Sequence, residues 1–88
     1  MTERDAVIVN SLGLHARPAA QIVRLANTFG SHIMVAKDGV AVNAKSIMGV
    51  MMLAAECGSS IRISAEGSDA EQAVSALENL VAQGFGET

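Results

Sequence analysis

The chain has 88 residues, half of them hydrophobic, and a formal net charge of −3 at pH 7. This length allows one domain, residues 1–88, with a single core. The negative charge and the presence of only two aromatic residues argue against a protein that binds nucleic acid. The single cysteine excludes an internal disulfide and fits a reducing compartment.

The beginning of the chain lacks a signal-peptide pattern, and no apolar run is long enough to span a bilayer. We therefore expect a soluble protein of the cytoplasm that does not insert into membranes. We also expect it to act as a monomer.

Hydrophobic periodicity predicts seven elements in the order β-α-β-β-α-β-α. The strands are expected at 4–9, 31–37, 40–43 and 61–66, and the helices at 16–28, at 47–53 and from 70 to the glycine at 84. Asp38-Gly39 is typical of a two-residue hairpin turn. Ser46 suits the N-cap of the short helix, and Ser68 with Glu71 predicts a capping box before the last helix. The alternation of the fourth strand favours an α+β fold, with all three helices on one face of a four-stranded antiparallel sheet.

The most informative stretch is Ser11–Ala20, in which His15, Arg17 and Pro18 lie within four positions. Proline is tolerated in the first helical turn, so Pro18 places the helix start just before it and His15 near the N-cap. The free N–H groups and positive dipole end of a helix start bind anions, most often phosphate. A histidine at its edge could hold a proton, a metal ion or a phosphoryl group.

Three motifs resemble the HPr family, the histidine phosphocarriers of the bacterial phosphoenolpyruvate-dependent phosphotransferase system. Gly13–Ala19 resembles the family's active-site signature, Asn43–Val50 the segment around a regulatory serine, and Ile63–Gly67 the last strand and its exit. With the length and the element order, this resemblance covers nearly the whole chain. It implies an open-faced β-sandwich with strand order 1-4-2-3, which the residue patterns alone do not separate from a ferredoxin-like arrangement.

The resemblance also implies that His15 accepts a phosphoryl group on Nδ1 from phosphorylated enzyme I and passes it to an EIIA-type partner. The backbone N–H groups of Ala16 and Arg17, with the Arg17 guanidinium, would hold the phosphoryl oxygens, while Pro18 fixes the helix start. A neutral imidazole attacks with a lone pair and needs no general base. We therefore expect a phosphorylated intermediate rather than an enzyme, with no cofactor and no metal ion.

By the same resemblance, Ser46 would be a regulatory site phosphorylated by an HPr kinase/phosphorylase, although helix capping alone also explains a serine there. A partner-docking patch would ring His15. Its expected members are Leu14, Ala20, Arg24, Ile47, Met48 and Met51. Methionine suits a surface that repacks against several partners. His32, at the start of a strand, is expected to be an ordinary surface residue.

Three alternatives stay open. Within the family, the chain could serve sugar uptake or a nitrogen-type regulatory branch. It could instead be an interaction module that is never phosphorylated, although the intact His15 argues against this. A metal site made of His15 and Cys57 would lack further ligands at suitable spacing.

Overall fold

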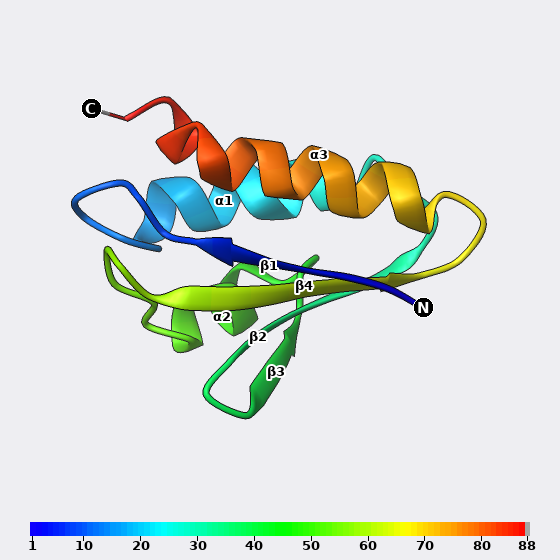
Figure 1. The fold of residues 1–88 in the computed structure, drawn as a ribbon, viewed down its shortest axis with the longest axis horizontal. Helices are drawn as coiled ribbons and strands as arrows, with labels where there is room; N and C mark the ends of the chain where they lie inside the picture. Colours follow the sequence, from blue (N-terminus) through cyan, green and yellow to red (C-terminus); the bar gives the residue numbers. More distant parts are fainter. Residues whose placement is uncertain (88) are drawn as a thin grey trace.

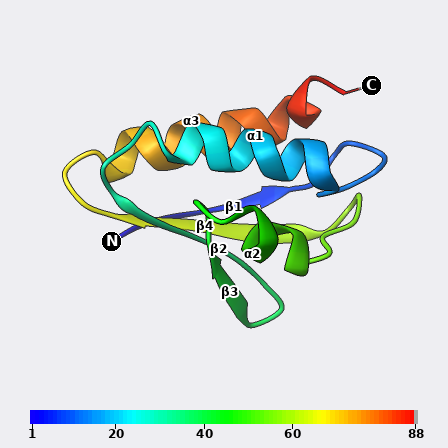
Figure 2. The ribbon, with the colours of Figure 1, turned by 180° about the vertical axis from the view of Figure 1, so that it is seen from behind.

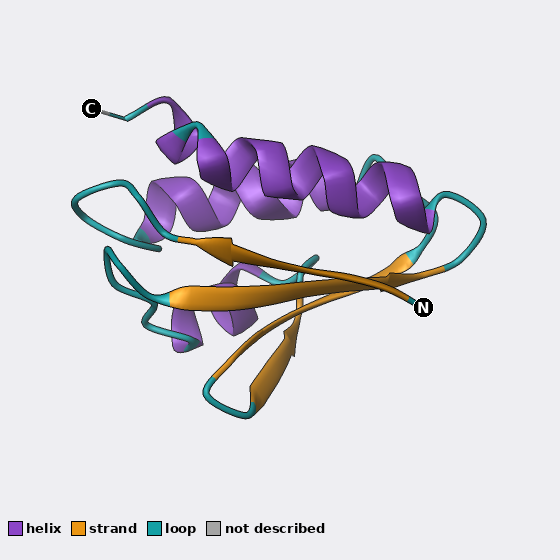
Figure 3. Cartoon of the chain, in the orientation of Figure 1, coloured by secondary structure: helices purple, strands orange, loops and turns teal. Residues whose placement is uncertain are grey.

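The computed structural model describes residues 1–87, which form a four-stranded antiparallel sheet, three α-helices and a short 3-10 turn (Figure 1; Figure 3). The elements are β1 (Thr2–Val7), α1 (Ala16–Ala26), β2 (His32–Lys37), β3 (Val40–Asn43), α2 (Ile47–Met52), β4 (Ser60–Glu66), α3 (Ala70–Ala82) and η1 (Gly84–Gly86). The strand order is β1-β4-β2-β3. This order and the element sequence confirm the expected fold. Within residues 1–87, no helix is long and apolar enough to cross a membrane.

The alternation of side chains along β4 separates the two faces of the sheet. Ile61 and Ile63 are buried beneath the helices, whereas Arg62 lies on the open face and pairs with Asp5 of β1 at 2.9 Å. Helices α1 and α3 run across the covered face (Figure 1). Helix α2 packs beside β3 (Figure 2), where Val50 is fully buried in the same core. One apolar face therefore carries all three helices, and the other meets solvent.

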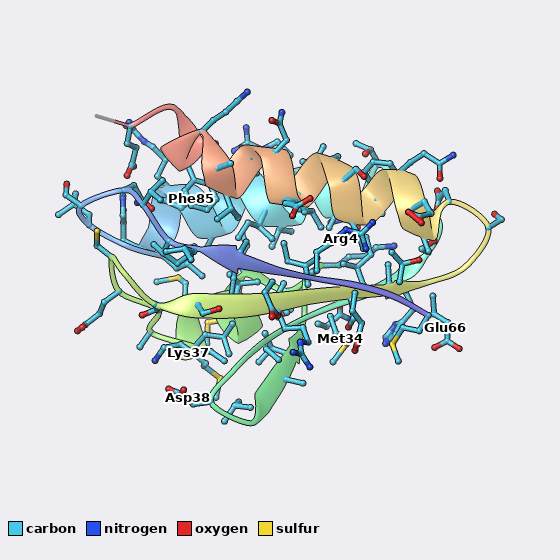
Figure 4. The ribbon with its side chains drawn as sticks, viewed as in Figure 1. Arg4, Met34, Lys37, Asp38, Glu66 and Phe85 are labelled. Atoms are coloured by element: carbon cyan, nitrogen blue, oxygen red, sulfur yellow. The ribbon has the colours of Figure 1, made fainter. Side chains whose placement is uncertain are left out.

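The predicted hairpin between β2 and β3 is confirmed. Asp38 and Gly39 have φ values of 52° and 82°, and two positive φ values in succession match the twist of the flanking strands. The Lys37 ammonium lies 3.2 Å from the Asp38 carboxylate. Figure 4 shows both side chains at this end of the hairpin.

Three predicted boundaries were wrong by two residues each. Strand β1 begins and ends two residues earlier than expected, because its pairing with β4 runs from Thr2–Ala65 to Val7–Ser60. Helix α1 ends at Ala26 rather than at Thr28. The hydroxyl of Thr28 donates to the Leu25 carbonyl at 2.7 Å. This side chain therefore satisfies a carbonyl that would accept a backbone N–H if the helix continued.

The predicted capping box before α3 was also wrong. The N-cap is Asp69 rather than Ser68, and no side chain caps the first turn. The Asp69 carboxylate instead accepts hydrogen bonds from the Ser31 hydroxyl and from the N–H groups of Gly30 (2.8 Å) and Ser31 (3.0 Å). These bonds, that of the hydroxyl foremost, hold the pKa of Asp69 below its ordinary value. Tertiary partners thus replace the local cap and tie α3 to the segment before β2.

One end of the molecule collects three segments that are distant in the sequence. The loop between β1 and α1, the loop after α2 and the C-terminal turn all lie at the left of Figure 1, opposite the N-terminus. The β1–α1 loop contains the candidate histidine motif, so this end holds the candidate site.

Candidate functional site

His15 is the N-cap residue of α1, as predicted. Its backbone is extended (φ −76°, ψ −173°), and its carbonyl accepts the N–H of Ala19 at 3.0 Å. The imidazole makes no capping hydrogen bond to the helix, and the side chain is 35% exposed. The ring is therefore fixed at the start of a helix and still open to solvent.

The first turn of α1 offers two backbone donors. Ala16 and Arg17 are the first two helical residues, so their N–H groups have no carbonyl one turn earlier to bond. Pro18, the third residue, has no N–H and is buried with Ala19. Two N–H groups and the positive end of the helix dipole are thus available to an anion.

Arg17 is exposed and forms no ion pair with any described side chain. Its guanidinium is permanently charged and presents parallel N–H donors that match two oxygens of a phosphoryl group. An arginine two residues from His15 is therefore free to move onto a group bound there.

The loop before His15 is held by a close backbone contact with the loop after α2. The Leu14 N–H donates to the Ala55 carbonyl at 2.9 Å, and Gly13 has a φ of 68°. A Cβ on Gly13 would overlap the Ala55 oxygen, so only glycine fits this approach. The prediction that Leu14 belongs to the partner-docking patch is corrected, because its side chain is 5% exposed and packs in the core. Leu14 anchors the loop instead.

A residue that sequence reasoning missed completes the surroundings of the ring. The Glu87 carboxylate oxygens lie 2.9 Å and 3.2 Å from Nε2 of His15. Glu87 also accepts the side-chain amide of Asn10 at 2.9 Å, and the same amide donates to the Gly13 carbonyl at 2.8 Å. Glu87 is 72 positions from His15, so no local pattern signals the contact.

The Glu87 contact distinguishes the two ring nitrogens. An ionised carboxylate can only accept, so Nε2 carries the hydrogen of a neutral imidazole placed here. Nδ1 has no hydrogen-bond partner among residues 1–87, and its lone pair is therefore available. A nucleophilic nitrogen beside two N–H donors and an arginine is suited to receive a phosphoryl group. No three His, Cys, Asp or Glu side chains within that range cluster as a metal site would require.

Comparison with known proteins agrees with this chemistry. A family model described as "PTS HPr component phosphorylation site" matches residues 2–83. The phosphocarrier protein HPr of Cupriavidus necator is 48% identical over 87 residues, which cover 99% of this chain and 98% of that protein. The crystal structure of HPr-C-His from Thermoanaerobacter tengcongensis superposes with a TM-score of 0.96 at 50% identity, covering 100% and 99% of the two chains. This chain belongs to the HPr family.

A second relative is the HPr-like protein Crh of Halalkalibacterium halodurans, 49% identical over 77 residues that cover 88% of this chain and 92% of that protein. HPr proteins are named as phosphocarriers of the phosphotransferase system, not as enzymes.

The second HPr-like motif forms the start of α2. Ser46 is the N-cap, as predicted, and its exposed hydroxyl oxygen accepts the Gly49 N–H at 3.1 Å. The structure therefore gives this serine a capping role and leaves its hydroxyl accessible at the surface.

The remaining residues of the expected patch lie on α1 and α2, which pack against each other. The three patch residues on α2, Ile47, Met48 and Met51, are exposed, and Met48 is the most exposed of them at 74%. Val50 of the same helix is buried in the core. Arg24 is exposed and Ala20 half-buried on α1. Exposed apolar side chains outside the expected set include Met52 on α2 and Leu12 in the loop before His15. His32 is exposed at the start of β2.

Proposed function

We propose that this HPr-family protein carries a phosphoryl group on Nδ1 of His15, received from phosphorylated enzyme I and delivered to an EIIA-type domain. One observation supports this most directly: Glu87 occupies Nε2, while Nδ1 is unengaged at the start of α1. Membership of a phosphocarrier family supports the same role. The protein would act in the cytoplasm as a monomer.

The chemistry requires little beyond positioning and charge. The Nδ1 lone pair forms the new P–N bond as the bond between phosphorus and its donor breaks, and no proton has to leave Nδ1. The N–H groups of Ala16 and Arg17 would donate to phosphoryl oxygens. The Arg17 guanidinium would balance the charge spread over those oxygens.

We infer that partners dock on one surface of α1 and α2. It consists of the half-buried Ala20 and the exposed Arg24, Ile47, Met48 and Met51. Two of these are flexible methionines, which adapt to partners of different shape. Arg24 would steer partners that carry acidic residues near their own sites. Leu14 has no part in this surface because it is buried.

The decisive experiment is phosphorylation of the purified chain by enzyme I and labelled phosphoenolpyruvate. We expect one acid-labile, base-stable adduct, because phosphohistidine has this stability. The adduct should disappear in His15→Ala and persist in the matched control His32→Ala, which removes the other histidine at an exposed position. Failure of the native chain to take up the label, or a label that persists in His15→Ala, would contradict the carrier role.

We also infer a regulatory role for Ser46, phosphorylated by an HPr kinase/phosphorylase. Its hydroxyl is exposed at the start of α2, next to apolar residues of the inferred docking surface. A phosphate there would add charge to that surface without removing an apolar contact of the core. Incubation with the kinase and ATP should give an acid-stable phosphate that is lost in Ser46→Ala and kept in Ser75→Ala, an exposed serine of α3. Absence of any acid-stable phosphate would leave Ser46 with capping alone.

A further inference from the structure

Glu87 lies beyond residues 2–83, the part of the chain that the family model matches. It nevertheless makes the closest described contact to the His15 ring. We propose that Glu87 is a positioning residue that keeps the hydrogen on Nε2 of His15 throughout loading and unloading of the phosphoryl group. This inference rests on the proposed carrier function.

The carboxylate is fixed from two sides. Both of its oxygens lie within hydrogen-bond distance of Nε2, and the side chain is only 15% exposed. Oε1 also accepts the amide of Asn10, a residue that is 3% exposed. The same amide bonds the Gly13 carbonyl, two residues before the histidine. Glu87 is thus attached to the ring and to the loop that carries the ring.

The orientation of the Asn10 amide is informative. Its nitrogen donates to Gly13 and Glu87, while its buried oxygen has no hydrogen-bond partner among the described residues. Rotating the amide by half a turn would set that oxygen against two acceptors, and both would lose the amide as a donor. The buried oxygen goes unpaired so that the carboxylate and the loop are both held, which indicates a fixed position for Glu87.

The C-terminal turn is packed, so Glu87 does not sit on a free arm. Phe85 is buried, and its carbonyl accepts the side-chain amide of Gln21 on α1 at 3.2 Å. Figure 4 shows Phe85 beneath the C-terminal turn, at the end of the molecule that holds the β1–α1 loop. Helix α1 therefore positions both the histidine at its own start and the segment that delivers the carboxylate.

The fixed hydrogen allows transfer without movement of a proton. During loading, the Nδ1 lone pair bonds phosphorus and the donor keeps the electron pair of its broken bond. The ring becomes a cation that retains its Nε2 hydrogen, opposite the anionic Glu87. During unloading, the P–N bond breaks and its electron pair returns to Nδ1. A neutral imidazole leaves, whereas loss of the Nε2 hydrogen beforehand would make the leaving group an imidazolate, which is a poorer one.

The test compares Glu87→Ala and Glu87→Gln with the native chain. Glu66→Gln is the matched control, because this exposed glutamate lies at the opposite end of the molecule (Figure 4). The ¹⁵N shifts of His15 report which ring nitrogen carries the hydrogen. Loading is measured with enzyme I and phosphoenolpyruvate, and unloading by transfer from the purified phosphorylated chain to an EIIA domain.

We expect Glu87→Ala to give a mixture of tautomers and to slow both steps by roughly tenfold, the lower end of the range for carboxylates that orient metal-binding histidines. Glutamine can still accept the Nε2 hydrogen but cannot balance a cation. Glu87→Gln should therefore keep the native tautomer, yet load about as slowly as the alanine variant, because the ring becomes a cation during loading. A purely structural role would not separate the tautomer from the loading rate in this way.

Native tautomer and native rates in Glu87→Ala would overturn the role of Glu87 while leaving the carrier function intact. Failure of the native chain to be phosphorylated on His15 would overturn both. The tautomer is read in the unphosphorylated chain, and Glu87→Gln retains the hydrogen-bonding shape, so a loss of stability in Glu87→Ala does not obscure the result.

Discussion

Gly13→Ala should destabilise the β1–α1 loop that carries His15. The loss in free energy of unfolding can be worked out from the structure in two parts. The φ of 68° places an alanine in the left-handed region, at about 1–2 kcal/mol. The new Cβ would approach the Ala55 oxygen to under 3.0 Å and the Glu56 Cα to 3.0 Å, so the two loops must move apart. That movement breaks or lengthens the 2.9 Å bond from Leu14 N–H to Ala55, worth about 1 kcal/mol.

Gly39→Ala is the matched control, because Gly39 has a φ of 82° and nothing lies within 4 Å of an added Cβ. Gly39→Ala should therefore cost only the conformational part, about 1–2 kcal/mol. Gly13→Ala should cost about 2–3 kcal/mol, which in a domain of this size lowers the melting midpoint by roughly 10–20 °C.

Urea unfolding gives the free energy of both variants, and the initial rate of phosphorylation by enzyme I reports on the loop. We expect Gly13→Ala alone to slow phosphorylation at a temperature where both variants are folded, because only that change moves the chain next to His15. Equal destabilisation by the two substitutions would refute the steric part of the reasoning. Unchanged phosphorylation in folded Gly13→Ala would refute its link to the site.

Three further predictions follow. Arg17→Lys should slow loading roughly tenfold without changing the urea midpoint, since lysine lacks the paired N–H donors, and an unchanged rate would contradict the assigned role. The pKa of Asp69 lies below its ordinary value, so its ionised form adds stability that is present above about pH 4 and lost as pH falls through the lowered pKa. Asp69→Asn should thus lower the urea midpoint at pH 7, with a deficit that shrinks towards pH 3; a constant deficit would argue against this linkage. Ser46→Ala should cost about 1 kcal/mol of stability and Ser46→Asp should restore it while slowing loading; stability that does not change in Ser46→Ala would remove the capping argument.

Local chemistry predicted those features that depend on a few adjacent residues. Asp38-Gly39 forms its hairpin because both residues tolerate positive φ, and Pro18 marks the helix start because proline is confined to the first turn. Ser46 caps its helix for a similar local reason. Local chemistry did not predict the strand order. The residue pattern left the open-faced sandwich and a ferredoxin-like arrangement open, and only the resemblance of three motifs to the HPr family favoured the first.

Apart from the end of α1, the features that sequence reasoning missed depend on tertiary contacts. The Asp69 carboxylate accepts hydrogen bonds from Ser31 and Gly30, which are 38 and 39 positions away. These bonds form in place of the predicted local capping box. The Glu87 contact to His15 requires the C-terminal turn to fold back over α1. Leu14 sits inside the signature motif, yet the tight approach of Gly13 to the next loop turns its side chain into the core. Neither composition nor periodicity carries information on such distant pairings.

The geometry of the site bears on how a phosphoryl carrier avoids binding the phosphoryl group too tightly to release it. A helix start can present several N–H donors to a phosphate, but here Pro18 occupies the third position and removes one of them. Arg17 is the nearby cation in the motif, and it is held by no ion pair in the described part of the chain. Stronger fixed donors would stabilise the loaded state more than the transition state and slow unloading. Two backbone donors and an exposed arginine, with a histidine oriented from its far side, suit a phosphoryl group that must arrive and leave with similar ease.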